Sequence, residues 1–501
     1  MTADRPVNRV LVVGAGPAGL MLAGELRLGG AEVVVVERRA EPVTESRAST
    51  VHSRTMEQFD SRGLLTEFGV PPSSPWGHFG GLPLDLRLPT PYPGLWKIPQ
   101  SAVERVLGRR AVQLGAQVRR RRGVIDVIDH GDHVEAVVTT GMGEARIRAA
   151  YLVACDGEES TVRDVLGVAF PGRPAGREML RADVSGIRVS DRRFERFPTG
   201  LAIASRGPDG VTRVMVHEFG APPSSTSPSF ADVVDVWKRV TGEDISGGTP
   251  LWVNAFGDAS RQVASYRQGR VLFAGDAAHQ QMPVGGQAMN LGLQDAMNLG
   301  WKLARHLGPQ PPAGLLDTYH TERHAVGAEA LGIITLQASM LLGGGEVDPI
   351  RAVTAELIGL PGARERLAGI ITGLGVRYDL GDGHPLLGAR LPHTRLNRGA
   401  EHTDTTTLLH GGRGLLLDLT GGGPVHREAA AWTDRVDVVP VAPATAGALA
   451  GLGAVLVRPD GYVAWTGADP DDAAGALERW FGPPAHPTED ADRRRESWTL
   501  M

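Results

Sequence analysis

The sequence predicts an α/β protein in which a parallel sheet flanked by helices is interrupted by an antiparallel sheet and followed by a small α/β domain. Three observations lead to this prediction: a strand, turn, helix, strand pattern within residues 8–50, alternating polarity within about 178–266, and short strands after the Gly- and Pro-rich stretch at 381–392. Continuous apolar strands are typical of sheets buried on both faces, whereas alternating strands are typical of sheets with one covered face.

Composition narrows the class of protein. A chain of 501 residues is too long for one core, so roughly two to four domains are expected. The formal net charge of −5 argues against a nucleic-acid partner, and no apolar run approaches the roughly 20 residues of a membrane span. The one cysteine, Cys155, excludes an internal disulfide and a cysteine-cluster metal site. We therefore expect a cytoplasmic protein, and its oligomeric state, monomer or homodimer, is left open.

The first domain is predicted to be discontinuous, over residues 1–177 and 267–385. Residues 9–13 and 33–36 are expected to form buried strands, and residues 18–28 between them a helix. After the insertion, the pattern resumes with a buried strand and a long helix, expected at 270–276 and 287–306.

The insertion is predicted over residues 178–266 and the last domain over 390–495. Alternation at residues 213–217 indicates an antiparallel sheet with one covered face. In the last domain, four short strands precede a helix expected at 471–481. A chain that leaves an α/β domain and returns to it creates a boundary between domains, where ligands commonly bind.

The strongest local motif is the glycine turn Gly14-Ala15-Gly16-Pro17-Ala18-Gly19, which follows a strand and opens a helix. In this fingerprint the first glycine permits a tight turn, the second lets a pyrophosphate approach the backbone, and the third lets the helix pack on the strand. Glu37 ends the next strand, where its carboxylate can bind a ribose. These features predict a Rossmann-like nucleotide-binding domain; a purely structural glycine turn is the alternative.

A second motif lies past the midpoint of the chain. Gly275-Asp276-Ala277-Ala278-His279 follows a buried strand, and residues 282–290, Met-Pro-Val-Gly-Gly-Gln-Ala-Met-Asn, lead into a helix. A carboxylate at a strand end can hold a polyol such as a ribityl chain. The glycine pair and the helix N-terminus can present N–H groups to an electron-rich ring edge. The alternative is a glycine turn that Asp276 merely caps.

Three segments together resemble the group A flavoprotein aromatic hydroxylases, which are FAD monooxygenases similar to para-hydroxybenzoate hydroxylase. They are the N-terminal glycine turn, residues 155–163 (CDGEESTVR) and the stretch from 275 to 290. The run GDAAHQQMPVGGQAMNLGLQDAMNLGWKL is similar to the branch that acts on aromatic polyketides in antibiotic pathways. The resemblance implies a Rossmann-like FAD-binding domain, an inserted antiparallel-sheet substrate domain and a C-terminal thioredoxin-like domain, here without cysteines.

The resemblance also implies which residues contact FAD. Glu37 would bind the adenosine ribose and Arg38 the adenine side. Asp276 would hold the ribityl chain. The other implied cofactor contacts are Gly14, Gly16, Pro17, Ala18 and Gly19 in the first turn, Arg47 and Gln100 near the pyrophosphate and ribityl chain, Val124 at the adenine, Asp156 in a motif associated with both FAD and NAD(P)H, and Pro283, Gly286, Ala288, Met289 and Asn290 at the flavin ring. For Arg47 and Gln100 the alternative is ordinary solvated surface.

The activity that the resemblance implies is hydroxylation of an aromatic substrate. NADPH or NADH, binding transiently, would reduce FAD, and O2 would then form a flavin C4a-hydroperoxide that attacks an electron-rich ring. The residue pattern identifies no catalytic side chain. By alternation, the substrate walls are expected to include Met215, His217, Trp252, Asn254 and Phe256, although each is also compatible with plain core.

Other activities remain open at this stage. A Baeyer–Villiger or epoxidising monooxygenase would use the same cofactor on a related polyketide. An FAD-binding accessory protein of a biosynthetic pathway would oxygenate nothing, and an FAD-dependent dehydrogenase or reductase would place no oxygen in its product.

Overall fold

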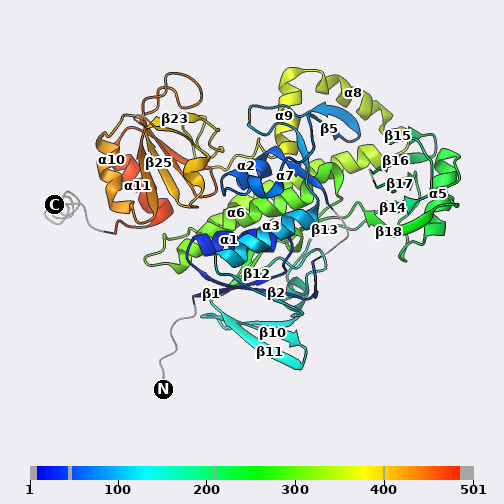
Figure 1. The fold of residues 1–501 in the computed structure, drawn as a ribbon, viewed down its shortest axis with the longest axis horizontal. Coiled ribbons are helices and arrows are strands. Elements are labelled where there is room, and N and C mark those ends of the chain that lie inside the picture. Colours follow the sequence, from blue (N-terminus) through cyan, green and yellow to red (C-terminus); the bar gives the residue numbers. More distant parts are fainter. Residues whose placement is uncertain (1–7, 43–47, 208, 399–400, 486–501) are drawn as a thin grey trace.

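A six-stranded sheet forms the centre of the molecule (Figure 1). The computed structural model describes residues 8–42, 48–207, 209–398 and 401–485. The central strands are ordered β20-β21-β12-β1-β2-β8, and all but the edge strand β20 run parallel. Their bounds are β1 (Arg9–Val13), β2 (Glu32–Glu37), β8 (Gln117–Arg120), β12 (Tyr151–Ala154), β20 (Arg267–Gln268) and β21 (Val271–Phe273).

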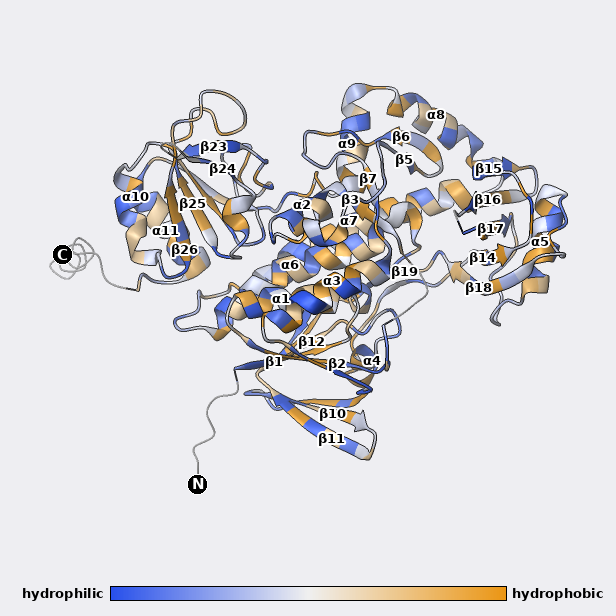
Figure 2. Ribbon diagram, in the orientation of Figure 1, coloured by the Kyte–Doolittle hydropathy of each residue, from blue (hydrophilic) through white to orange (hydrophobic). Residues whose placement is uncertain are grey.

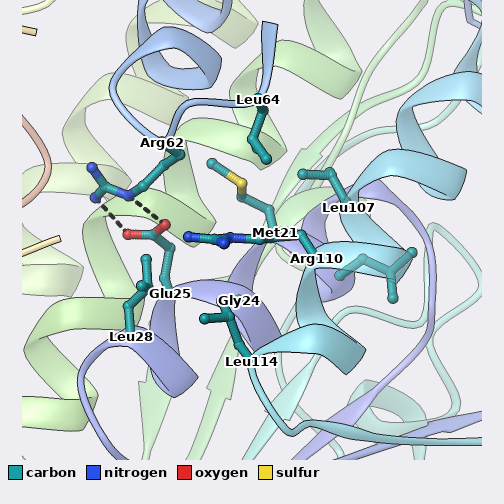
Figure 3. A pocket seen from close by; sticks show the side chains of 10 residues that line it. Met21, Gly24, Glu25, Leu28, Arg62, Leu64, Leu107, Arg110 and Leu114 are labelled. Carbon is teal, nitrogen blue, oxygen red and sulfur yellow. Dashed lines mark hydrogen bonds and ion pairs between the residues drawn. The ribbon is translucent and has the colours of Figure 1, made fainter. Parts of the chain in front are cut away.

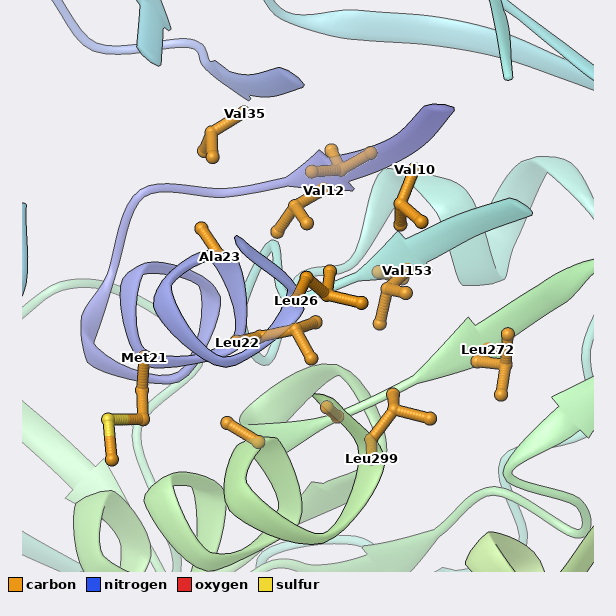
Figure 4. Close-up of a cluster of buried hydrophobic side chains, with 14 of the residues drawn as sticks. Val10, Val12, Met21, Leu22, Ala23, Leu26, Val35, Val153, Leu272 and Leu299 are labelled. Carbon is orange, nitrogen blue, oxygen red and sulfur yellow. The ribbon is translucent and has the colours of Figure 1, made fainter. Parts of the chain in front are cut away.

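Helices cover one face of this sheet and a small antiparallel sheet covers the other (Figures 1 and 2). Side chains of α1 and α6 interleave above β1 and β12, as the buried cluster in Figure 4 shows. The two helices approach closely because Gly300 has no side chain; a Cβ there would lie 2.3 Å from the Cβ of Glu25. The covering elements are α1 (Pro17–Leu28), α3 (Gln100–Gln113), α6 (Gln287–Leu307), β9 (Val124–Asp129), β10 (Val134–Thr140) and β11 (Gly143–Ala149).

The inserted sheet is antiparallel, with the order β15-β16-β17-β14-β18. One face is covered by α5 (Phe230–Thr241), whose buried Trp237 packs against Val214 and Val216. The opposite face packs against the far end of α7 (Asp317–Leu342). The strands are β14 (Glu178–Ser185), β15 (Arg192–Phe197), β16 (Gly200–Arg206), β17 (Thr212–Glu218) and β18 (Thr249–Gly257).

The C-terminal domain holds a four-stranded mixed sheet, ordered β26-β25-β27-β28, with helices α10 and α11. Strands β25 and β26 are parallel and the other pairs antiparallel, the arrangement expected of a thioredoxin-like domain. Trp301 of α6 packs into this domain against Trp480 and Phe481. The elements are β25 (Gly414–Asp418), α10 (Pro424–Ala429), β26 (Val436–Pro440), β27 (Ala454–Val457), β28 (Val463–Gly467) and α11 (Pro470–Phe481).

The remaining elements are mostly short. They are β3 (Thr50–His52), α2 (Ser53–Asp60), η1 (Leu65–Phe68), β4 (Ser73–Ser74), β5 (Trp76–Phe79), β6 (Leu82–Asp85), β7 (Leu95–Lys97), α4 (Thr161–Val165), β13 (Gly172–Arg173), β19 (Ser260–Gln262), η2 (Gly275–Ala277), β22 (His279–Gln280), η3 (Val284–Gly286), η4 (Gly345–Val347), α8 (Asp348–Ile358), α9 (Pro361–Thr372), β23 (Arg395–Arg398), β24 (Glu401–Asp404), η5 (Thr407–Leu409) and η6 (Ala430–Trp432).

By length and composition, α7 is long and apolar enough to cross a membrane. The same helix carries Glu322 and Arg323, whose side chains form buried ion pairs. It also packs against α6 in the middle of the molecule. Its apolar character is therefore that of a core helix.

Candidate flavin site

The three glycines of the first turn differ in why glycine occupies the position. A Cβ on Gly14, where φ is +102°, would lie 2.3 Å from the carbonyl oxygen of Cys155, and a Cβ on Gly19 would lie 2.1 Å from the carbonyl oxygen of Gly14. The fold itself therefore requires these two. Gly16 has ordinary extended backbone, with φ −78° and ψ −178°, and a Cβ there would meet nothing within 4 Å among the described residues. Gly16 instead leaves open space at the N-terminus of α1 among the described residues, so a pyrophosphate approaching there would meet no side chain.

Glu37 lies beside this turn because β1 and β2 are parallel neighbours that end together. Its Oε2 accepts a hydrogen bond from the N–H of Ala15 at 2.8 Å, and its Oε1 accepts one from the N–H of Arg39 at 2.8 Å. Arg38 follows and is exposed. The segment that leads into β9 also contacts the end of β2, since the N–H of Arg122 donates a hydrogen bond to the carbonyl oxygen of Glu37 at 2.8 Å.

Val124 is buried at the start of β9, two residues beyond this contact. The structure therefore brings Glu37, Arg38 and the backbone near Val124 to one end of the sheet, beside the open space at Gly16.

Asp276 follows the end of β21, at the same edge of the parallel sheet. The neighbouring Gly275 touches the first turn: a Cβ on Gly275 would lie 3.1 Å from the Cβ of Ala18. No hydrogen bond or ion pair holds the Asp276 carboxylate within the part of the chain that the structure describes. The Asp276 side chain is exposed at the surface. The protein around it nevertheless reduces the hydration of its carboxylate, which raises the pKa of the carboxyl. Asp276 thus keeps its acceptors available among the residues that the structure describes.

The glycine pair before α6 forms a turn that β3 holds from behind. Gly285 and Gly286 have positive φ values of +67° and +70°. The Asn290 amide donates to the carbonyls of Thr50 and Gly286 at 2.9 and 2.8 Å, and its oxygen accepts from the N–H of His52 at 2.9 Å. The Asn290 side chain therefore shapes the turn, and its contact with a flavin stays a prediction.

His52 completes this support, since its Nε2 lies 2.8 Å from the carbonyl oxygen of Gly285. Burial lowers the pKa of His52 to about 4, so the ring is neutral at physiological pH and donates through Nε2. Beside the turn, Ala288 and Met289 are half-buried and Pro283 is exposed.

Three other predicted cofactor contacts have local roles or lie outside the described residues. Asp156 accepts hydrogen bonds from the Ser160 hydroxyl at 2.6 Å and the Val162 N–H at 3.2 Å, which caps α4. Gln100 donates to Glu104 at 2.8 Å within the first turn of α3. Arg47 lies outside the described residues. Their contact with a cofactor stays a prediction.

The predicted substrate residues share one face of the inserted sheet, the face away from α5. Met215 and Phe256 are half-buried and pack in a cluster with Met282 and Val284, which flank Pro283 before the glycine pair. His217 is buried between two carbonyl oxygens, 2.6 Å from that of Glu178 and 3.0 Å from that of Leu342. Burial lowers the pKa of His217. Its ring joins the sheet to α7.

Arg181, which the sequence reasoning missed, gathers the other predicted substrate residues. Its guanidinium lies 4.5 Å from the Trp252 ring centroid and 5.2 Å from that of Phe256. Its Nε donates to the Asn254 oxygen at 3.0 Å. The available signal was an arginine inside the apolar strand Met179-Leu180-Arg181-Ala182, but only the strand register places it opposite Asn254.

Two cavities differ in character, and the second borders the candidate site, since His52 and Asn290 also line it. The first, between α1 and α3, measures about 10 Å³ and is bordered by the buried Glu25–Arg62 ion pair (Figure 3). The second, of about 50 Å³, lies between α6, α7 and α9, and Gln287 and Gln294 are among its lining residues. Cavities of these sizes hold at most a few water molecules. Neither is large enough for an aromatic substrate.

Comparison with known proteins identifies the class. A family model described as an FAD binding domain matches residues 8–332, and one described as the C-terminal domain of aromatic-ring hydroxylases matches residues 384–484. The chain belongs to the FAD-dependent aromatic-ring hydroxylases, and its cofactor is FAD.

Individual relatives cover nearly the whole chain. Rifampicin monooxygenase of Streptomyces venezuelae is 40% identical over 492 residues, covering 94% of this chain and 98% of the relative. The crystal structure of CabE, an aromatic hydroxylase from angucycline biosynthesis, is 46% identical, with a TM-score of 0.91 and coverage of 96% of this chain and 100% of that chain. Dialkyldecalin synthase of Streptomyces rugosporus is 38% identical over 493 residues, covering 95% of this chain and 100% of the relative.

Proposed function

We propose that this protein hydroxylates an aromatic, polyketide-derived small molecule, with NADPH or NADH as reductant and O2 as oxidant. The observation that carries the proposal is the open space at Gly16 beside Asp276, whose carboxylate has no partner among the residues that the structure describes. Two nucleotide-binding motifs from distant parts of the chain meet there through Ala18 and Gly275. The similarity to rifampicin monooxygenase and to CabE supports a polyketide substrate.

Each part of the site has a task in this reaction. When bound, FAD supplies the acceptance of electrons from NAD(P)H and the activation of O2. Gly16 and the N-terminus of α1 receive the pyrophosphate, Glu37 the ribose and Asp276 the ribityl hydroxyls. The N–H groups that open α6 face the flavin ring. Met215 and Phe256 then hold the substrate ring and exclude water from the reacting atoms.

The proposed domain division follows the same organisation. Residues 1–177 and 267–385 form the FAD-binding domain, 178–266 the substrate domain, and 390–495 the thioredoxin-like domain. The five-stranded sheet over 178–257 supports the insertion. We place the protein in the cytoplasm, as a monomer or homodimer.

The test is the coupling of NADPH oxidation to O2 uptake with a panel of polyketide phenols. The proposal expects a substrate that accelerates both rates in a one-to-one ratio, with little hydrogen peroxide. A panel that includes ketones and alkenes would distinguish hydroxylation from Baeyer–Villiger oxygenation or epoxidation. If no member of the panel accelerated NADPH oxidation and O2 uptake, the result would contradict an oxygenase function.

A second candidate is an FAD-binding synthase that consumes neither NADPH nor O2. The similarity to dialkyldecalin synthase favours it. This function predicts conversion of a substrate at an unchanged rate when NADPH is omitted and O2 is removed. The monooxygenase function predicts that both omissions abolish conversion.

A further inference from the structure

A buried carboxylate on α6 contacts the segment that carries Asp276. Asp295 is fully buried, and its Oδ2 lies 3.1 Å from the N–H of Gly275 and 2.9 Å from Nε2 of His279. A carboxylate only accepts, so Nε2 of His279 bears the proton of that contact. One oxygen thus holds both ends of the five-residue segment 275–279, and Asp276 lies within it.

The opposite oxygen of Asp295 is held in place as well. Arg323 of α7 donates through Nε to Oδ1 at 2.7 Å, and its guanidinium is also fully buried. Burial alone would raise the pKa of Asp295, but Arg323 and His279 outweigh it and hold the pKa below its ordinary value. Asp295 is therefore an anion that three donors fix on both oxygens.

We propose that Asp295 is a positioning residue for the flavin site. Its Oδ2 holds the backbone N–H of Gly275 before Asp276 and the imidazole of His279 after it, so the ribityl-binding carboxylate is held in its binding geometry before FAD arrives. Because this preorganisation removes the cost of ordering the segment on binding, it appears in the affinity for FAD. The inference rests on the proposed function in one respect, the placement of the ribityl chain at Asp276.

The first experiment compares two buried carboxylates. Asp295→Asn leaves one acceptor oxygen where donors face two, so it cannot satisfy both Arg323 and the 275–279 segment. Glu322→Gln removes a buried carboxylate that pairs with Lys302 and Arg458 and does not contact residues 275–279. Apoprotein of each variant is titrated with FAD and with ADP. ADP probes only the half of the site around Gly16 and Glu37.

The proposal expects Asp295→Asn to raise the Kd for FAD by at least about tenfold, because binding must then order the segment, with the Kd for ADP unchanged. Glu322→Gln should leave both constants unchanged even where it lowers the melting temperature. Equal losses of FAD and ADP affinity in Asp295→Asn would overturn the proposal, because they would indicate general destabilisation. So would an unchanged Kd for FAD.

A second pair keeps the proposal testable if Asp295→Asn does not fold. His279→Gln retains a donor toward Asp295, and His279→Leu fills the space without one. FAD affinity is expected to survive in the first and to fall in the second, with ADP affinity equal in both. Equal FAD affinity in the two would reject the positioning role. Asp276→Ala with unchanged FAD affinity would instead reject the placement of the ribityl chain.

Discussion

At the scale of single residues, two glycines of the first turn differ in whether the fold itself requires them. Gly14 and Gly16 lie two positions apart in one turn, but only Gly14 combines positive φ with a backbone contact where its Cβ would be. The same motif therefore contains one glycine that the fold requires and one, Gly16, that we propose only the ligand requires. Substitution distinguishes them.

We expect Gly14→Ala to destabilise the protein by at least about 1–3 kcal/mol, because its backbone is strained for any other residue. Gly16→Ala should leave stability unchanged and weaken FAD binding at least about tenfold, or about 1.4 kcal/mol. Urea unfolding and FAD titration measure the two effects. Gly24→Ala on α1, whose Cβ also meets nothing within 4 Å, is the control with unchanged FAD affinity. A Gly16→Ala variant that binds FAD normally would contradict the assignment.

Asp276 is expected to lower the stability of the folded apoprotein and to strengthen FAD binding. The surrounding protein raises its pKa, so the folded apoprotein binds this proton more tightly than the unfolded chain does. The carboxylate therefore lowers stability above its ordinary pKa of 3.8. We expect Asp276→Asn to raise the melting temperature of the apoprotein at pH 7, with no difference below pH 3.8, and to weaken FAD binding. A lower melting temperature at pH 7 would contradict this account.

At the residue scale, the sequence predicted the motifs but not their supports. Spacing placed Glu37 at the end of one strand and Asp276 just after another buried strand. Because parallel strands end at one edge of their sheet, both residues lie at that edge. Nothing in the sequence distinguishes Asp295, buried between Gly275 and Arg323, from a helical carboxylate that faces solvent. Only the packing of α6 against α7 decides that.

At the scale of elements, alternation along β17 assigns its side chains to two different environments. Val216 faces α5 in a closed core, whereas Met215 faces the cluster with Met282 and Val284. We expect Val216→Ala to cost about 1–3 kcal/mol of stability with KM for substrate unchanged. Met215→Ala should cost less stability and raise KM about fivefold, a loss of about 1 kcal/mol of apolar contact. The reverse pattern would show that the substrate lies elsewhere.

Element positions were predicted well where the pattern was long or strongly apolar. The helix expected at 287–306 is α6 (Gln287–Leu307), and the helix expected at 471–481 is α11 (Pro470–Phe481). The helices α5 and α7 were not predicted. The apolar residues of α7 form no single stripe. In α5 the signal was present and was missed, since Val233, Val234, Trp237 and Val240 lie on one buried face and Ser229 and Asp232 form a capping box. Nor could the sequence predict that His217 is used in joining β17 to α7, since Leu342 lies 125 residues away.

At the scale of the whole molecule, a buried ionic cluster joins the C-terminal domain to the FAD-binding domain. Arg458 bridges Glu322 of α7 and Asp460, and Lys302 of α6 contacts Glu322 at 2.8 Å. Burial would raise the pKa of Glu322, but Arg458 and Lys302 lower it from 4.5 to about 2. The domain therefore does not dock through apolar contacts alone.

This cluster predicts how stability changes with acid. Because the folded pKa of Glu322 is depressed, its contribution is present above pH 4.5 and is lost as the pH falls toward 2. We expect Glu322→Gln to cost about 3–5 kcal/mol at pH 7 and to flatten the decline in unfolding free energy between those values. Glu67 forms an exposed ion pair with Arg109, so Glu67→Gln should change neither the unfolding free energy at pH 7 nor its decline in acid. A decline as steep as in the wild type would contradict this role.

The whole molecule is, on this account, a scaffold that holds one FAD against one aromatic ring and delivers an oxygen atom from O2 to it. The most direct measurement is mass spectrometry of the product formed under ¹⁸O2 with NADPH. The account predicts a product that carries one ¹⁸O atom and retains none when labelled water replaces labelled gas. Product formed under ¹⁸O2 without the label would contradict it.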